Sequence, residues 1–387
     1  MIMSSKKIPR QVKILGFVSL FTDMASEMLY PVTPIFLTAV LGSSMAVVGL
    51  IEGLAEITAG FFKGYFGNLS DRIGKRSVFV RIGYSLSAIT KPLPGIFPHI
   101  STVLFSRVTD RIGKGIRTAP RDALLAGYSE NNSGAVFGFH RAMDTLGAAL
   151  GPISALVLLH FFPDNYTLIF LVAFFPSVIA IGFTVPVKDK PVEVHHKEKK
   201  NYKLFWSAAP AEYKKLIILF TLFSLVNSSD VFLILKSKDV SHSSTLAILG
   251  YIFYNFVYAL ASYPLGRFSD KYGKKNIFVT GLLIYSAVYL GFALTSHLTV
   301  VWILFAFYGI YAASTEGVAR AWVSDMVPDK NRGTAIGLLT MLSGFAIMIG
   351  SFLAGILWDQ LGSQAPFLFS AVVSFVIVIL FFSIKKT

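Results

Sequence analysis

The chain has 387 residues, of which 54% are hydrophobic and only 14% are charged, and its formal net charge is +14. Soluble domains carry roughly a quarter charged residues, so this composition excludes an ordinary soluble protein and indicates an integral membrane protein. The chain contains no cysteine, which excludes disulfides, thiolate metal sites and a cysteine nucleophile. The positive charge lies mainly in loops on one side of the predicted spans, so we read it as a topology signal and expect no nucleic-acid partner.

Apolar stretches recur along the whole chain and reach about 20 residues, long enough for a helix to cross a hydrocarbon core of roughly 30 Å. No strand-length alternation of apolar and polar residues is evident, which argues against a transmembrane barrel. The basic residues 1–13 lead into an apolar run without an Ala-x-Ala end, so we expect a first span rather than a cleaved signal. We predict an all-α integral membrane fold with twelve transmembrane helices, near residues 12–38, 45–67, 78–97, 101–126, 135–160, 166–186, 214–236, 244–266, 277–296, 299–323, 334–358 and 366–384.

One long polar stretch, which contains KDKPVEVHHKEKK, interrupts this series of spans. It divides the chain into an N-terminal six-helix bundle at 1–186, a cytoplasmic connector at 187–213 and a C-terminal six-helix bundle at 214–387. Lysine and arginine gather before the first span, in the connector, and after spans two, eight, ten and twelve, all on one side. By the positive-inside rule we expect both termini to be cytoplasmic, and we expect a bacterial inner membrane.

Two loops of the chain are near copies: GNLSDRIGKRS at 67–77 and GRFSDKYGKKN at 266–276. The same spacing of 199 residues relates further pairs of identical residues over about eighty positions. These pairs include Arg121 and Arg320, Gly134 and Gly333, Gly138 and Gly337, and Gly151 and Gly350. The constant spacing indicates an internal duplication, and because each half holds six spans the halves share one topology. Pseudo-symmetric parallel repeats of this kind are typical of secondary transporters.

The first of these loops carries a resemblance to a known family. GNLSDRIGKRS matches the signature G-x-x-x-D-R-x-G-R/K-R/K, which the major facilitator superfamily carries between its helices two and three. YPVTPIF at 30–36 resembles the helix-one signature of the twelve-helix drug:proton antiporters, and GAALGPISA at 147–155 resembles their helix-five signature without its final glycines. SRVTDRIG at 106–113 resembles their helix-four signature R-x-x-Q-G-x-G, but Asp110 and Arg111 replace the glutamine and glycine. The resemblance covers the whole chain and favours export.

The resemblance implies two six-helix bundles around a central cavity and transport by rocking of one half against the other. It also implies that both loops are cytoplasmic gate elements, with Asp71 latched to the start of helix eleven, where a carboxylate gains about 0.3–1 kcal/mol. We expect Arg121 to pair with Asp71 and, by symmetry, Arg320 with Asp270. Gly74 is expected to supply a turn with positive φ. The alternative is that these charges only enforce topology. The predicted gate residues are Gly67, Asp71, Arg72, Gly74, Arg121, Gly266, Asp270, Lys271, Gly273 and Arg320.

Charged residues inside membrane spans are costly and usually functional, and here they crowd into the first half. Their spacing on helix four places Arg107, Arg111 and Lys114 on one helical face. A carboxylate without a neighbouring cation is suited to carry a proton, and a cation without a neighbouring carboxylate is suited to bind an anionic substrate. Carboxylates and cations that pair with one another have a structural role instead. The sequence leaves both interpretations open. The candidates for substrate binding or proton coupling are Asp23, Glu27, Arg107, Asp110, Arg111, Lys114, His140, Arg141 and Asp144.

Two further patterns concern packing and substrate contact. Gly147 and Gly151 have the spacing that lets two helices approach closely. Tyr251, Tyr254 and Tyr258 are candidates for substrate contact, although the sequence does not separate them from core residues.

The interpretation that fits these features best is a secondary active transporter that exports a small organic molecule, anionic or zwitterionic, by proton-coupled alternating access. The alternative within transport is a proton-symport importer of an organic anion, such as a carboxylate-rich metabolite or siderophore. A non-transporting membrane sensor or scaffold is a third interpretation, and it predicts decayed gate loops, which this sequence does not have. We expect no enzyme activity, no cofactor and no metal, a proton gradient as the energy source, and a monomer whose partners are its substrate and the lipid bilayer.

Overall fold

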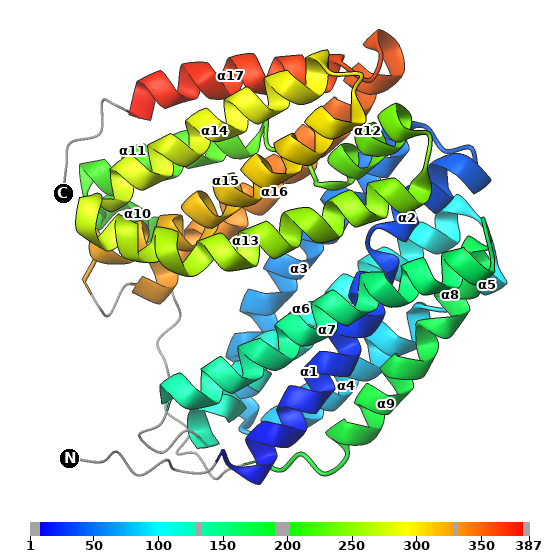
Figure 1. Cartoon of the computed structure of the whole chain (residues 1–387). Coiled ribbons are helices and arrows are strands. Elements are labelled where there is room, and N and C mark those ends of the chain that lie inside the picture. Colours follow the sequence, from blue (N-terminus) through cyan, green and yellow to red (C-terminus); the bar gives the residue numbers. More distant parts are fainter. Residues whose placement is uncertain (1–7, 129–132, 190–201, 329–331, 382–387) are drawn as a thin grey trace. The chain divides into compact units, whose positions relative to one another are not determined.

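The chain is helical throughout the described part of its structure (Figure 1). The computed structural model describes residues 8–128, 133–189, 202–328 and 332–381, and all regular structure in these ranges is helix. A bilayer offers no hydrogen-bond partners to the backbone, so a spanning segment must satisfy its own N–H and C=O groups. The long apolar runs of this chain do so as helices, and the predicted all-α class is confirmed.

The helices of the first six spans begin and end close to the predicted positions. Short breaks divide three of these spans, between α1 and α2, between α4 and α5, and between α8 and α9. The segment η1 continues α2 as a π-helix. The segments are α1 (Arg10–Leu29), α2 (Val32–Ile35), η1 (Phe36–Val40), α3 (Met45–Ile73), α4 (Arg76–Thr90), α5 (Leu93–Ile96), α6 (Ile100–Tyr128), α7 (Ser133–Phe161), α8 (Tyr166–Val172) and α9 (Phe174–Thr184).

The last six spans follow the same plan, with one addition. The predicted polar connector contains a short helix, α10, whose Phe205 and Trp206 rings lie 5.5 and 6.3 Å from the ring of Tyr213, centroid to centroid. This aromatic contact fastens α10 to the next helix. The segments are α10 (Tyr202–Ala208), α11 (Ala211–Ser224), α12 (Val231–Ser241), α13 (Ser244–Tyr272), α14 (Lys274–Leu294), α15 (Leu298–Asp325), α16 (Arg332–Leu361) and α17 (Ala365–Phe381).

Seven stretches of the described chain are long and apolar enough to cross a membrane by length and composition alone. The other five spans depart from that simple pattern for visible reasons. Breaks interrupt the spans of α1–α2, α4–α5 and α11–α12, the interior of α6 is rich in charge, and α17 has only 17 residues. Together these segments make the twelve transmembrane helices of two pseudo-symmetric six-helix bundles.

The helices pack into two compact units. The first unit comprises residues 1–42 and 58–197, and the second comprises residues 43–57 and 198–387. The start of α3 therefore packs with the second unit, and the remainder of α3 packs with the first.

In the first unit α1 packs against α7 and α9, and α4 packs against α6 (Figure 1). The approach of α1 to α7 depends on two glycines. A Cβ atom at Gly147 would lie 2.3 Å from the carbonyl oxygen of Leu20, and one at Gly151 would lie 2.4 Å from that of Met24. Only glycine fits at such separations, so the close packing predicted at these positions is confirmed. The apolar core beside these helices consists of Val12, Leu15, Val18, Val80, Tyr84, Leu124, Leu125, Val136 and Val187.

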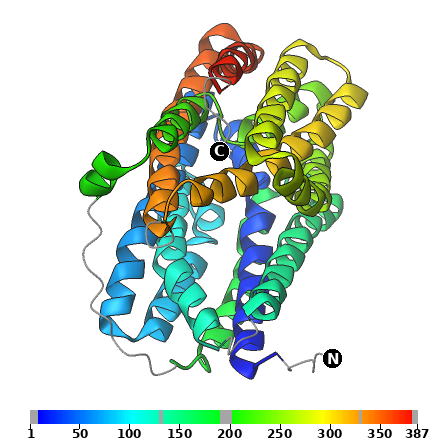
Figure 2. The ribbon, with the colours of Figure 1, turned by 90° about the vertical axis from the view of Figure 1, so that its left-hand side faces the viewer.

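In the second unit α13, α14 and α15 form one packed group, drawn in yellow-green to yellow-orange in Figure 2. α14 also packs against α17, and α11 packs against α16. Gly350 of α16 repeats the role of Gly151 one repeat later, since a Cβ atom there would lie 2.3 Å from the carbonyl oxygen of Leu225. The duplication has therefore kept a close helix approach in each half.

The first residues of α3 are held by α16 within the second unit. The Asp359 carboxylate accepts hydrogen bonds from the backbone N–H groups of Met45 at 2.9 Å and Ala46 at 2.8 Å. These N–H groups have no partner inside their own helix, and a carboxylate also complements the positive end of the helix dipole. Asp359 thus caps α3 from another helix.

The repeated loops end in the turn that the sequence predicts. Gly74 has a φ of +71° and Gly273 a φ of +94°, values that L side chains adopt only with strain. The positive φ predicted at Gly74 is confirmed. α3 continues beyond Gly67 to Ile73, and a Cβ atom at Gly67 would lie 3.0 Å from the Cβ of Ala119.

Candidate functional site

The first span breaks in the middle, between Tyr30 and Pro31. Proline has no N–H group to continue the helical ladder, and the Thr33 hydroxyl donates to the carbonyl oxygen of Leu29 at 2.8 Å. A second hydroxyl, that of Thr38, donates to the carbonyl oxygen of Pro34 at 3.0 Å. Both are hydroxyl bonds to the carbonyl four residues earlier, and they add hydrogen bonds to the backbone on either side of Pro34 within the membrane.

The seventh span breaks at the matching place. α11 ends at Ser224 and α12 begins at Val231, with Asp230 as its N-cap residue. Asp230 lies 199 residues after Pro31, so the two breaks are equivalent in the duplicated halves. The Tyr285 hydroxyl donates to the carbonyl oxygen of Val226 at 2.8 Å and stabilises the unwound segment. Broken spans at corresponding positions of two repeats point to a substrate site in transporters.

In the first unit a cluster of charged side chains surrounds Asp144 of α7. The Asp144 carboxylate accepts a short hydrogen bond from the Ser19 hydroxyl of α1 and lies 3.5 Å from the Nδ1 atom of His140. Arg121 of α6 donates to Ser19 at 3.4 Å and pairs with Asp122 at 2.9 Å. Three helices of the unit therefore bring charged groups to one place.

Asp23 belongs to the same cluster. It is half-buried, and the charged groups that act on it are those of Asp144, Lys114, Arg121 and Arg117. The cluster thus holds two carboxylates and several cations, so that a change of position or protonation of one group alters the field on the others.

Near the break of the first span, the Arg107 guanidinium lies over the Tyr30 ring at 5.6 Å from its centroid. This geometry is a cation–π contact. Glu27, one helical turn beyond Asp23, is half-buried and makes further contacts. The predicted candidates on α1 and at the start of α6 thus lie close to the broken segment.

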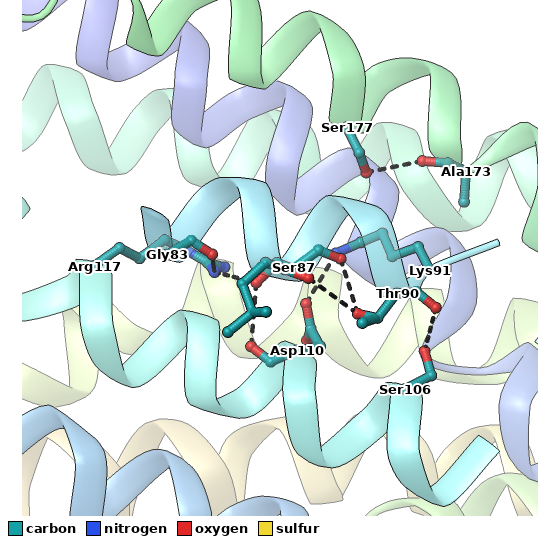
Figure 3. A network of polar contacts seen from close by, with 10 residues as sticks. Gly83, Ser87, Thr90, Lys91, Ser106, Asp110, Arg117, Ala173 and Ser177 are labelled. Carbon is teal, nitrogen blue, oxygen red and sulfur yellow. Dashed lines mark hydrogen bonds and ion pairs between the residues drawn. The ribbon is translucent and has the colours of Figure 1, made fainter. Parts of the chain in front are cut away.

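A second network joins α4 and α6 (Figure 3). Lys91 Nζ lies 3.0 Å from Asp110 Oδ1, with the two side chains only 3% and 14% exposed. Arg117 donates to the Ser87 hydroxyl at 2.5 Å, and that hydroxyl donates to the backbone carbonyl of Asp110 at 3.1 Å. The Arg117 guanidinium also lies 4.5 Å from the centroid of the Tyr84 ring. This network fixes one helix against the other.

The candidates on α6 therefore have different surroundings. Asp110 lies in a buried ion pair, Arg111 is buried, Arg107 is half-buried, and Lys114 is exposed. The structure brings Asp23, Lys114, His140 and Asp144 together and places Asp110 in the α4–α6 network, whose Arg117 also acts on Asp23. The side chain of Arg141 lies outside those that the structure describes.

The gate residues are only partly described. The side chains of Asp71, Arg72 and Asp270 lie outside the described part of the structure. Arg121, expected to pair with Asp71, contacts Asp122 and Ser19 among the described side chains, and its pairing with Asp71 stays a prediction.

The remaining gate cations lie on the surface of the second unit. Lys271 and Arg320 are exposed, and Lys271 lies over the ring of Tyr272 at 5.1 Å from its centroid. In the same region Lys274 pairs with Asp325 across α14 and α15. The gating role of these residues stays a prediction.

The family model of the Major Facilitator Superfamily matches residues 15–253 and 231–387. The chain is a member of the major facilitator superfamily. It is thus a multi-pass membrane transporter, and transporters of this superfamily bind small-molecule substrates within the membrane.

Three members of the superfamily illustrate the likeness. The MFS-type transporter MJ1317 of Methanocaldococcus jannaschii is 34% identical over 383 residues, covering 96% of this chain and 94% of that protein. The proton-coupled antiporter flippase LtaA of Staphylococcus saprophyticus is 24% identical, covering 86% and 83%. The crystal structure of the nucleoside transporter NupG has a TM-score of 0.84 at 15% identity, covering 97% of this chain and all of that one. The last similarity concerns the superfamily fold alone.

Two features of the site were missed by the sequence reasoning. Lys91 is a charged residue within the third predicted span, immediately before Pro92, and this position alone is a signal. Asp230 aligns with Pro31 at the repeat spacing, which marks it as the counterpart of the first break. Its partner Tyr254 on α13 was among the sequence candidates for substrate contact, whereas its partner Tyr308 on α15 carries no comparable signal, because tyrosine is common in helix cores.

Proposed function

We propose that this transporter exports a small organic molecule, anionic or zwitterionic, in exchange for protons by alternating access. It would act in the inner membrane of a bacterial cell with both termini in the cytoplasm. The proton gradient would supply the energy.

The observation that carries this proposal is the cluster around Asp23 and Asp144. Both carboxylates lie in membrane-spanning helices of the first unit, close to Lys114 and Arg121. Intramembrane ionisable residues are retained at a cost and mark ion pathways and proton relays. His140 beside Asp144 adds a third group that exchanges protons near neutral pH in many proteins.

The exposed Lys114 and the half-buried Arg107 support an anionic group on the substrate. The likeness to a proton-coupled antiporter over most of both chains supports proton exchange and export. The partial antiporter signatures at residues 30–36 and 147–155 favour the same direction.

The test is proton flux in liposomes that contain the purified full chain and a pH-sensitive dye. A panel of organic anions, zwitterions and cations is supplied on one side, and a pH gradient is imposed. The wild type is expected to move protons in the direction opposite to one class of substrate. Asp23→Asn is expected to stop this coupled flux and to leave substrate exchange at equal pH. Glu212→Gln, which removes a carboxylate of α11 beside the half-exposed Lys215, serves as the matched control.

Two outcomes contradict the proposal. Coupled proton flux that survives in Asp23→Asn shows that the proton travels elsewhere. Protons that move in the same direction as an organic anion establish the symport importer instead.

A further inference from the structure

The second unit contains a tyrosine–carboxylate cluster, formed by Asp230, Tyr254, Tyr258, Tyr289 and Tyr308, which the proposed function does not use. The Tyr254 hydroxyl of α13 donates to Asp230 Oδ2 at 3.0 Å. The Tyr308 hydroxyl of α15 donates to Asp230 Oδ1 at 2.6 Å. Each carboxylate oxygen thus has a fixed direction and keeps a further lone pair for another donor.

The rings of this cluster are close to one another. The Tyr254 ring is stacked with that of Tyr258, at 6.4 Å between centroids and 11° between planes. It lies 5.0 Å from the ring of Tyr308, which in turn lies 6.3 Å from that of Tyr289. Tyr258 donates to Glu316 Oε2 at 3.0 Å. The carboxylate of Asp230 therefore lies among several aromatic faces.

Two further carboxylates act on the Asp230 carboxylate. The strongest charged influences on Asp230 come from two other carboxylates of the second unit, Glu316 and Glu56. In the first repeat the position equivalent to Glu316 is held by Arg117, which donates to Ser87 inside its own unit. The second repeat has replaced that cation by an acid.

A buried hydroxyl in the cluster also lacks a hydrogen bond. Tyr289 is 1% exposed, and its ring stacks on that of Tyr285 at 4.0 Å between centroids. Among the described residues its hydroxyl makes no hydrogen bond of acceptable distance and angle. A buried polar atom of this kind is unfavourable unless another group supplies the missing partner.

Carboxylate oxygens among aromatic faces are the recognition chemistry of organic ammonium groups. A metal ion would instead need several free oxygens that converge on one point. Here each carboxylate is held by its own tyrosines, Asp230 by Tyr254 and Tyr308, and Glu316 by Tyr258. The arrangement therefore matches an amine better than a metal.

We propose that Asp230 and the surrounding tyrosines bind an amine or quaternary ammonium group of the transported molecule. The inference rests on the proposed function and narrows it, from anionic or zwitterionic substrates to substrates that also carry an ammonium group.

Binding of simple probes to the purified full chain tests this site directly. The probes are 2-phenylethylamine, its N-trimethyl derivative, the neutral 2-phenylethanol, and sodium chloride. Their dissociation constants are measured by titration calorimetry and by thermal shift. Both ammonium ions are expected to bind the wild type at least tenfold more tightly than the alcohol.

The variants separate the carboxylate from its surroundings. Asp230→Asn removes the charge at nearly constant shape and is expected to weaken ammonium binding roughly 10-fold to 100-fold, the usual range for a hydrogen bond to a charged group. Tyr308→Phe is expected to weaken it by a smaller factor, and it keeps the test decisive if Asp230→Asn does not fold. Glu212→Gln, on α11 beside the half-exposed Lys215, is expected to bind as the wild type does.

Several results overturn the inference. One is equal binding of 2-phenylethanol, which means that the rings provide only an apolar surface. Another is unchanged ammonium binding in both Asp230→Asn and Tyr308→Phe. A third is stabilisation by sodium alone, and a fourth is no ammonium binding at all. The proton-flux assay is independent of these measurements. If coupled flux persists while ammonium binding is absent, the proposed function stands and this inference falls.

Discussion

We expect the ion pair between Lys91 and Asp110 to contribute strongly to the free energy of unfolding. We also expect the loss of Asp110 to destabilise the protein more than the loss of Lys91. Removing one partner of a buried pair costs about 3–5 kcal/mol, because the other charge is left buried. Arg111 and Arg117 also act on Asp110, so three cations share one carboxylate. After Lys91→Met the carboxylate still faces two arginines, and we expect a loss of about 3 kcal/mol. After Asp110→Asn the three cations lose their shared carboxylate, and we expect a loss of about 5 kcal/mol, the upper end of that range.

The assay is unfolding of the purified chain in mixed micelles at increasing SDS, followed by circular dichroism. The double variant should lose less than the sum of the two single losses, with a coupling of roughly 2 kcal/mol, since neither charge is then left alone. Lys215→Met is the control. This lysine is 50% exposed and pairs with Glu212 at 3.4 Å, so its loss should cost about 1 kcal/mol or less.

Additive losses, or a greater loss for Lys91→Met than for Asp110→Asn, would refute this account of the network. Transport by the double variant adds a second result. If Asp110 only joins α4 to α6, transport persists in the double variant, whereas its loss would restore the substrate or proton role predicted for Asp110 from the sequence.

Three further predictions concern packing, loop conformation and capping. Gly151→Val should prevent the approach of α1 to α7 and yield aggregated protein on size-exclusion chromatography. Gly182→Val, where an added Cβ atom meets no atom within 4 Å, should remain monodisperse. Equal elution profiles of the two variants would contradict the packing argument. Gly74→Ala should lower the free energy of unfolding by about 1 kcal/mol because its φ is +71°, and an unchanged SDS midpoint would count against it. Asp359→Ala should cost about 1 kcal/mol by uncapping α3, and Asp359→Asn less, since its amide oxygen still accepts one hydrogen bond; equal midpoints for both variants would rule out the cap.

The helices could be predicted from the sequence because the bilayer leaves the backbone few options. Apolar length, the position of basic loops and the repeat spacing fixed the spans to within a few residues. The sequence did not predict that α3 extends beyond Gly67 to Ile73, because the polar residues of this segment are equally typical of a loop at the membrane surface. The helix α10 was missed for the same reason, since it lies in a polar stretch and packs through its rings against Tyr213.

The pairing of charges could not be predicted, because it depends on rotation and depth of each helix to within a few ångströms. Asp110 and Lys91 lie on different spans, and no local spacing relates them. The contacts of Arg121 with Ser19 and Asp122 likewise join positions that no local pattern singled out. Repeat symmetry indicated which positions are equivalent, but not which chemistry each position holds.

The two repeats have kept their packing and changed their interior. Gly151 and Gly350 still allow the same close helix approach, while Arg117 in one repeat corresponds to Glu316 in the other, and Thr90 to Tyr289. A duplicated gene that conserves backbone contacts is free to let its copies specialise. Under selection for a new transported molecule, substitutions should therefore occur around the tyrosines of the second repeat. Under selection for a new energy source, they should occur among the charged residues of the first repeat. A mutant library restricted to one repeat would therefore vary either the transported molecule or the energy source, but not both.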